Sequence, residues 1–104
     1  MHEPVLLQEV LEALAPKKGE SYLDATAGYG GHSGAILALT TNYADSVLVD
    51  RDQMAIDHLR TLFNEKGVHI LHQDFLSAAE QLVKDGEQFD IILADLGVSS
   101  PHLD

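Results

Sequence analysis

The stretch that decides how the rest of this chain is arranged is Asp24-Ala25-Thr26-Ala27-Gly28-Tyr29-Gly30-Gly31-His32-Ser33. The run 21–23 before it is typical of a β-strand, and the apolar run 35–39 after it is typical of a helix. Glycine lets the backbone approach a ligand closely and tolerates positive φ. A helix start also offers N–H groups that have no partner within the helix. The sequence therefore predicts a ligand site at a strand-to-helix turn.

The glycines of this turn match only half of the dinucleotide fingerprint G-x-G-x-x-G. Gly28 and Gly30 supply the first half, whereas Ser33 stands where the third glycine or alanine is expected. Asp50 follows the apolar run 47–49, at a position where a carboxylate can accept both hydroxyls of a ribose. This pattern predicts a nucleoside site, which a nicotinamide dinucleotide or S-adenosylmethionine would satisfy.

The front of the loop favours the second of these ligands. S-adenosylmethionine has no phosphate to place on a helix start, and its methionine end carries an ammonium group. Asp24 and the adjacent glycines Gly30 and Gly31 suit such a ligand better than a pyrophosphate. Asp24 either binds the ammonium group or orders the loop through its own hydrogen bonds.

Length and composition predict one small, soluble, cytoplasmic domain. The chain has 104 residues, a normal apolar fraction of 45% and no cysteine, which excludes disulfides and cysteine-based zinc sites. No apolar run approaches the roughly 20 residues of a membrane span, and no basic, then apolar, leader opens the chain. The histidines show no recognisable ligand spacing, so no metal site is predicted.

The charge of the chain argues against a nucleic-acid-binding surface within these residues. The net charge is −11, and the six Lys and Arg residues are scattered. A nucleic-acid enzyme normally presents a basic face to the phosphates. If nucleic acid is the substrate, we expect the groups that hold it to lie elsewhere.

Strands and helices are predicted to alternate along the whole chain. A helix with apolar residues at Leu7, Val10, Leu11 and Leu14 comes first, with Pro4 in its first turn, and is more simply a packing helix than a partner-binding one. Asp52 is a candidate helix cap, and Ser77 to Glu80 has the form of a capping box. The other expected elements are strands at 21–23, 45–50, 68–71 and 89–94, and helices around 35–39, from 53 to about 64, with the apolar face Ala55, Ile56, Leu59, Leu62 and Phe63, and around Leu82 and Val83.

This alternation predicts a parallel α/β sheet with helices on both faces. In the usual Rossmann-like arrangement the strand order is 3-2-1-4. The loops after the four strands then meet at one edge of the sheet. With about four strands, we expect this sheet to be an incomplete version of that fold.

The closing segment 95–104, Asp-Leu-Gly-Val-Ser-Ser-Pro-His-Leu-Asp, is the most specific motif. Together with His2-x-Pro4-Val5-Leu6-Leu7, the glycine loop and Asp50-Arg51-Asp52, it resembles the bacterial S-adenosylmethionine-dependent rRNA cytosine-N4 methyltransferases known as MraW or RsmH. The resemblance covers the whole chain. It implies a class I methyltransferase fold, of which residues 1–104 are the N-terminal, donor-binding part, without the target-binding and C-terminal parts.

The resemblance also implies roles for individual residues. Gly30, Gly31 and His32 line the donor site, Asp50 binds the ribose, and Phe75 contacts the adenine. Asp95 faces the donor and is the candidate catalytic residue, because an acceptor there could hold the N–H groups of the cytosine amine; the alternatives are a simple cofactor contact and loop capping. His102 stands where the family usually has glutamine, and it cannot reproduce both functions of an amide.

Two other functions stay open beside the methyltransferase one, and two partners are predicted. The chain could be a non-catalytic module that binds a nucleoside or a partner, or an NAD-binding Rossmann protein. As a methyltransferase part it would act on small-subunit ribosomal RNA through regions outside these residues. The apolar fourth strand, with Ile91, Ile92 and Leu93, would form an open sheet edge, which predicts a homodimer through that edge.

Overall fold

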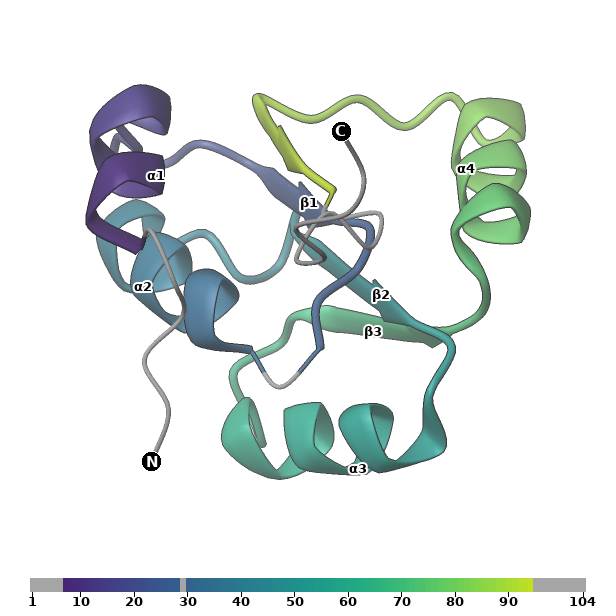
Figure 1. The fold of residues 1–104 in the computed structure, drawn as a ribbon. Helices are drawn as coiled ribbons and strands as arrows, with labels where there is room; N and C mark the ends of the chain where they lie inside the picture. The colour runs from purple at the N-terminus through teal and green to yellow at the C-terminus, as the bar shows by residue number, and fades with distance from the viewer. Residues whose placement is uncertain (1–6, 29, 95–104) are drawn as a thin grey trace, which may run out of the picture.

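The computed structural model describes residues 7–28 and 30–94. Its elements in chain order are α1 (Leu7–Leu14), β1 (Tyr22–Asp24), α2 (Gly31–Thr40), β2 (Val47–Asp50), α3 (Gln53–Leu62), β3 (His69–His72), α4 (Phe75–Lys84) and β4 (Ile91–Leu93). The four strands form one parallel sheet in the order β3-β2-β1-β4 (Figure 1). Both the predicted alternation and the predicted strand order are confirmed.

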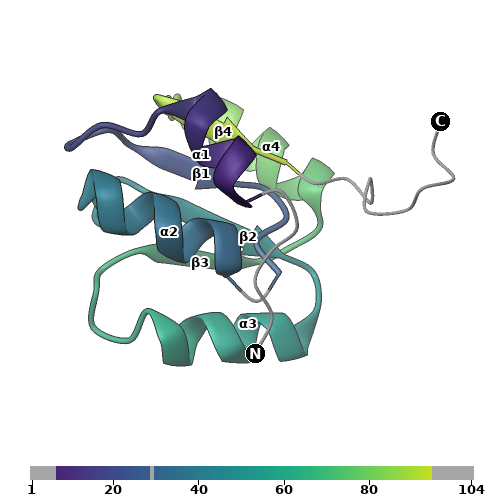
Figure 2. The same ribbon diagram turned by 60° about the vertical axis from the view of Figure 1, so that its left-hand side comes forward.

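Side chains alternate between the two faces of the sheet, so each face builds its own core. On one face Tyr22, Leu48 and Ile91 pack with buried residues of α2 and α3. On the other face Val47 and Val49 pack with Ala78 of α4. Figure 1 accordingly shows α4 apart from the other helices, and Figure 2 shows α4 and α3 at opposite ends of the view, top and bottom. The prediction of helices on both faces is correct.

The first helix packs on the core. Leu11 and Leu14 of α1 are partly buried against the larger core cluster. The helix ends at Leu14, because Ala15 adopts a positive φ of 44° just before Pro16. Pro4, which we expected in the first turn, lies outside the described residues.

β1 and β3 have the predicted lengths, each shifted by one residue, whereas β2 and β4 are shorter than predicted, because side chains replace backbone pairing at their starts. Before β2, the buried Ser46 donates from Oγ to the Asn42 carbonyl at 2.6 Å and accepts from the Tyr22 N–H at 3.1 Å. Before β4, Asp90 accepts from the Ser21 N–H at 2.9 Å and from Ser21 Oγ at 3.2 Å. These polar side chains set the strand starts at Val47 and Ile91.

The predicted capping box at Ser77 is wrong. α4 begins at Phe75, and its cap is Asp74, whose carboxylate accepts from the Ser77 N–H at 2.8 Å and from Ser77 Oγ at 3.0 Å. Ser77 is therefore a hydrogen-bond donor to the cap and not the cap itself, because Asp74, three residues earlier, already occupies the N-cap position. Asp52 does cap α3, as predicted, by accepting from the Met54 N–H at 3.0 Å.

One predicted core residue of α3 is largely outside the core. Ala55, Ile56, Leu59 and Phe63 are buried as expected, but Leu62 is 48% exposed. The helix ends at Leu62, so the chain turns before the predicted end near residue 64. Leu62 instead lies beside the glycine loop, where its Cδ2 comes close to Gly30.

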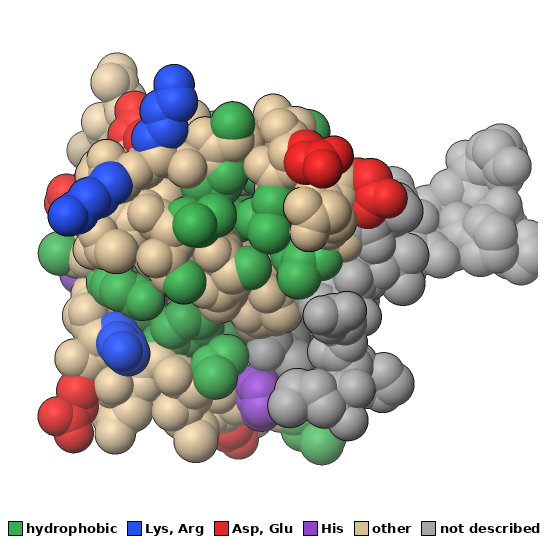
Figure 3. Space-filling model, turned by 90° about the vertical axis from the view of Figure 1, so that its left-hand side faces the viewer, with side chains coloured by type: hydrophobic (Ala, Val, Ile, Leu, Met, Phe, Trp, Pro, Cys, Tyr) green, Lys and Arg blue, Asp and Glu red, His purple; other side chains and the backbone are tan. Residues whose placement is uncertain are grey.

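The sheet leaves apolar surface uncovered at the β4 end. β4 pairs with β1 on one side, and no strand of the described residues pairs with its other side. Ile91 is buried, whereas Ile92, which points to the opposite face, is 59% exposed. Figure 3 looks at the side of the molecule where α1 and α2 lie, and it shows hydrophobic side chains gathered over the middle of that face without a continuous stripe of Lys and Arg.

Candidate functional site

The glycine loop joins β1 to α2 at the carboxyl edge of the sheet. Backbone hydrogen bonds hold it between two strands: the Ala25 N–H donates to the Leu93 carbonyl at 2.9 Å, and the Ala27 N–H to the Val49 carbonyl at 2.8 Å. Gly28 then adopts a φ of 58° and Gly30 a φ of 86°. The described residues of the loop are therefore tied to the sheet edge, at the strand-to-helix turn that the sequence predicted.

The two positive-φ glycines serve different purposes. A Cβ on Gly30 would lie 2.9 Å from Leu62 Cδ2 and 3.1 Å from Leu59 Cδ2, so its missing side chain lets the loop approach α3. A Cβ on Gly28 would meet no atom within 4 Å. The missing side chain of Gly28 thus leaves open space beside the loop, where a ligand could approach the backbone.

Asp50, the last residue of β2, is tied to the same loop. Its Oδ2 accepts from the Gly28 N–H at 2.8 Å, and its Oδ1 accepts from the Asp52 N–H at 2.9 Å. Each carboxylate oxygen can accept a second hydrogen bond. The half-buried carboxylate is therefore held in one orientation and can still accept two hydroxyls of a ligand.

Asp24 has a structural role, which was one of the two roles considered for it. The residue is only 2% exposed. Its Oδ2 accepts from the hydroxyls of Tyr22 and Ser33, both at 2.8 Å, and its Oδ1 accepts from the Thr26 N–H at 3.1 Å. Ser33 is fully buried, so the serine that breaks the dinucleotide fingerprint anchors the start of α2 to β1.

Burial dominates the electrostatics of this network. It raises the pKa of the Asp24 carboxyl above its usual value, although the hydrogen bonds from Ser33 and Tyr22 favour the charged form. Burial, together with the neighbouring Asp24, also raises the pKa of the Tyr22 hydroxyl far above its usual value. Tyr22 consequently remains a hydrogen-bond donor.

Two buried polar atoms near this edge have no hydrogen-bond partner among the described residues. They are Nε2 of His32, in the first turn of α2, and Oε1 of Gln73, directly after β3. Buried polar atoms are usually paired, so both are candidates for contact with a ligand. His32 was predicted from the sequence. Gln73 was not, and only its position after a strand could have drawn attention to it.

Of the remaining predicted site residues, one lies at the carboxyl edge of the sheet and two lie outside the described part of the chain. Phe75 is half-buried at the start of α4. It follows Asp74 at the same sheet edge as Asp50, because parallel strands end together. Asp95 and His102 lie outside the described residues.

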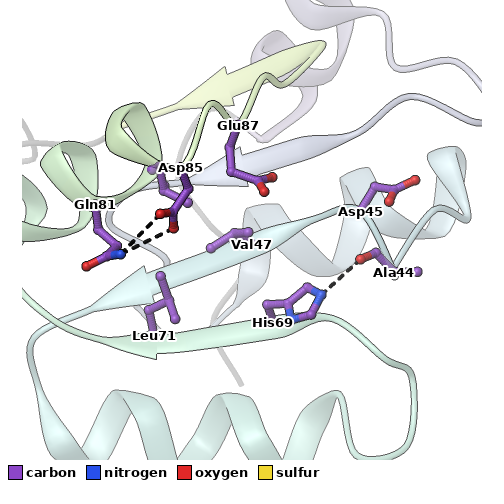
Figure 4. Close-up of a pocket in the computed structure, with 9 residues that line it drawn as sticks. Ala44, Asp45, Val47, His69, Leu71, Gln81, Asp85 and Glu87 are labelled. Carbon is purple, nitrogen blue, oxygen red and sulfur yellow. Dashed lines mark hydrogen bonds between the residues drawn. The ribbon is translucent and has the colours of Figure 1, made fainter.

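A hollow of about 320 Å³ lies at the opposite, amino edge of the sheet (Figure 4). Val47 and His69, the first residues of β2 and β3, form part of it, and α4 contributes Gln81 and Leu82. Asp45, Asp85 and Glu87 also line it, with no Lys or Arg. The Asp85 carboxylate accepts from Gln81 Nε2 at 3.2 Å. This hollow is separate from the glycine loop, and we do not assign the ligand to it.

Comparison with known proteins identifies the family. The model of the MraW methylase family matches residues 1–104. The chain belongs to the MraW methylase family. It is 44% identical over its whole length to "Ribosomal RNA small subunit methyltransferase H" of Nitratidesulfovibrio vulgaris (strain DSM 19637 / Miyazaki F), and 45% identical over 99% of its length to the protein of that name from Aromatoleum aromaticum. These matches cover 30% and 33% of the relatives, so this MraW chain spans about a third of their length.

Solved structures support the fold of the MraW chain. PH0851 aligns with 77% of this chain and 19% of its own, with a TM-score of 0.64 and 25% identity. Mycolic acid cyclopropane synthase CmaA1 aligns with 65% of this chain and 27% of its own, with a TM-score of 0.53 and 16% identity. The second likeness is one of fold alone. Among the described residues no helix is long and apolar enough to cross a membrane, and no metal-binding group of His, Cys, Asp and Glu occurs.

Proposed function

We propose that this chain binds S-adenosylmethionine at the carboxyl edge of its sheet, as the donor-binding part of a methyltransferase that acts on the N4 amine of a cytosine in small-subunit ribosomal RNA. The observation that carries the proposal is the Asp50 carboxylate, fixed by Gly28 and Asp52 with acceptor capacity to spare. Membership of the MraW methylase family and the names of the relatives support the reaction class.

The residues of this edge fit the parts of the donor. Asp50 would accept the ribose hydroxyls, and the open space at Gly28 would leave room beside it. The N-cap of α2 is Gly30, which has no side chain to cap the helix, so the N–H groups of its first turn are available to the carboxylate of the methionine end. Asp24 does not bind the ammonium group in this assignment, because its oxygens already accept from Tyr22 and Ser33. Phe75 would lie against the adenine.

The bound donor would supply an electrophilic methyl group on a sulfonium. The task of the protein is then to hold the acceptor amine in line with that methyl group. We assign to Asp95, two residues after the end of β4 in the sequence, the role of accepting an N–H of the amine, which makes the nitrogen lone pair more available. His32 and His102 would each contribute one hydrogen bond to the donor. The ribosomal RNA itself would be held by groups outside these residues, since the chain has a net charge of −11. We place the reaction in the cytoplasm, with the ribosomal subunits.

The first test is calorimetric titration of the chain with S-adenosylmethionine and, for comparison, with NAD. We expect S-adenosylmethionine to bind, NAD to bind at least tenfold more weakly, and Asp50→Ala to abolish binding. Asp52→Ala is the matched control, because it removes a neighbouring carboxylate that caps α3 but leaves the Asp50 side chain in place. Circular dichroism must show that each variant is folded. Equal binding of NAD, or full binding by a folded Asp50→Ala variant, would contradict the proposal.

We also propose that two copies of this chain pair through the free edge of β4. That edge has no partner strand among the described residues, and Ile92 beside it is 59% exposed. Exposed apolar edges pair with other chains. Sedimentation velocity should show a dimer that Ile92→Lys converts to a monomer. A wild-type monomer over a wide concentration range would refute this pairing.

A further inference from the structure

The outer edge of β3 has unpaired backbone groups. β3 pairs with β2 on one side, and no strand of the described residues pairs with its other side. The N–H groups of His69 and Gln73 donate to carbonyls of the β2 segment, at 3.1 Å and 3.0 Å. Since the direction of these bonds alternates along a parallel strand, the N–H and C=O groups of Ile70 and His72 point to the open side.

β3 also lacks the features that usually keep a sheet edge from pairing. Native edges are commonly blocked by Lys, Pro or a bulge. The sequence of β3 is His-Ile-Leu-His, and its register with β2 runs without a bulge. All its residues are exposed or half-buried, whereas most of β2 is buried. The edge can therefore accept a further strand, which is a common way for a domain to bind an extended peptide.

The hollow at the amino edge of the sheet lies beside this open strand, since β3 contributes two of its four residues to the lining. The base of the hollow is apolar, because Val47 and Leu82 are buried. Its rim is acidic, because exposed carboxylates line it and no Lys or Arg does; they belong to Asp45, Asp85 and Glu87. Figure 4 shows Asp85 and Glu87 directed toward the strands. An apolar base with an acidic rim suits the long stem and cationic head of Lys or Arg.

The arrangement of these charges decides between possible occupants. The described residues contain no group of three or more His, Cys, Asp and Glu side chains that could hold a metal ion, so the rim suits an elongated ligand and not a single ion. RNA would bring further negative charge to a chain of net charge −11. A second copy that paired β3 with β3 would bring its own three carboxylates to the same edge. A basic polypeptide is the occupant that meets no repulsion.

We propose that the open edge of β3 and the acidic hollow together form a docking site for an extended, basic segment of a partner protein. The segment adds a strand to β3 through the backbone of Ile70 and His72. Side chains on one face of a strand lie about 7 Å apart, so Lys or Arg at every second position would enter the hollow. The backbone bonds supply affinity, and the carboxylates select the sign of the partner's charge. This site lies at the edge opposite the glycine loop and leaves the donor site free.

The test measures binding of labelled peptides by fluorescence anisotropy at one fixed ionic strength. The probe is the end-blocked peptide Lys-Val-Lys-Val-Lys. Its controls are the isomer Lys-Lys-Lys-Val-Val, which has the same charge without the alternation, and the acidic peptide Glu-Val-Glu-Val-Glu. We expect the probe to bind several-fold more tightly than its isomer, and the acidic peptide not to bind.

Two charge reversals locate the bound peptide. Asp85→Lys should weaken binding of the probe by roughly 3- to 30-fold, because it replaces an exposed attraction by a repulsion. Asp57→Lys on α3 is the matched control and should leave binding nearly unchanged. Both carboxylates are exposed, and each accepts from a glutamine four residues earlier in its helix. Equal weakening by the two variants would mean that the peptide is attracted by the net charge alone, and would overturn the proposal.

A proline substitution tests the added strand. His72→Pro removes an N–H that faces the open side, a position where an edge strand tolerates proline. We expect it to weaken binding of the probe, whereas His72→Val keeps the N–H and should not. Equal binding by the two variants, each shown to be folded by circular dichroism, would overturn the proposal. A dimer that survives Ile92→Lys and excludes the probe would place a second copy on β3, and would overturn it as well.

Discussion

Replacing Asp24 tests whether the buried network below the glycine loop holds the site together. In Asp24→Ala the hydroxyls of Tyr22 and Ser33 lose their shared acceptor. Ser33 can still donate to the Tyr22 oxygen, 3.4 Å away, which leaves the Tyr22 hydroxyl as the buried donor without a partner. The unsatisfied Tyr22 hydroxyl and the lost hydrogen bonds from Ser33 and from the Thr26 N–H together cost about 3 kcal/mol. For a domain of this size, that lowers the melting temperature by about 15 °C.

Asp24→Asn isolates the charge from the hydrogen bonds. The amide keeps an acceptor for one donor, and its NH₂ can donate to a hydroxyl oxygen, so we expect a loss of only about 1 kcal/mol. Because burial raises the Asp24 pKa, the wild-type carboxyl contributes stability fully below its ordinary value of 3.8 and loses it as the pH rises through the folded-state pKa. The deficit of Asp24→Asn should therefore be larger in acid than at neutral pH.

The assay is urea unfolding followed by far-ultraviolet circular dichroism, over a pH series that starts below the ordinary carboxyl pKa of 3.8 and rises through neutral pH. Two results would refute the reasoning. A loss below about 1 kcal/mol in Asp24→Ala would mean that the buried hydroxyls find other partners. A deficit of Asp24→Asn that grows with pH would mean that the hydrogen bonds, and not burial, dominate the ionisation of Asp24.

Further predictions concern the loop and the cap of α4. Gly30→Ala should lower the free energy of unfolding by about 2–3 kcal/mol, because it combines a φ of 86° with a Cβ 2.9 Å from Leu62 Cδ2. Gly28→Ala, whose Cβ would meet no atom within 4 Å, should lower it by only about 1 kcal/mol. Equal losses of the two variants in urea titrations would contradict this assignment. The hydrogen bonds from Ser77 lower the Asp74 pKa, so the cap stabilises α4 above the ordinary value of 3.8 and this stabilisation is lost as the pH falls through the lowered pKa. The stability difference between wild type and Asp74→Ala, measured by urea unfolding over a pH series, should shrink in acid, and a constant difference would exclude the carboxylate as the cap.

The strand order was predictable because alternation indicates a parallel sheet, and the usual Rossmann-like arrangement of such a sheet has the order 3-2-1-4. Apolar runs that alternate with helical patterns leave few topologies for a small parallel sheet, and the glycine loop marks where the first crossover begins. Strand and helix ends were less predictable, because they depend on single polar side chains. Ser46 and Asp90 replace backbone pairing before β2 and β4, and Asp74 outcompetes the box that begins at Ser77.

The candidate site was predictable only in part for a related reason. The carboxyl edge and Asp50 follow from the order of elements. The sequence left the role of Asp24 open, because only the packed structure brings the hydroxyls of Tyr22 and Ser33 to its carboxylate. The unpaired oxygen of Gln73 has no sequence signature, since it depends on what surrounds the side chain in the fold.

The most direct test of the central claim is to map the donor on the chain by NMR. Amide resonances of the isotope-labelled protein would be followed during titration with S-adenosylmethionine. The proposed site predicts shifts at the carboxyl edge and none at the hollow on the amino edge. The edge amides are those of Gly28, His32, Asp50, Gln73 and Phe75, and the hollow amides are those of Ala44, Asp45, Asp85 and Glu87. Shifts confined to the hollow, or no shifts in the folded chain at saturating donor, would contradict it.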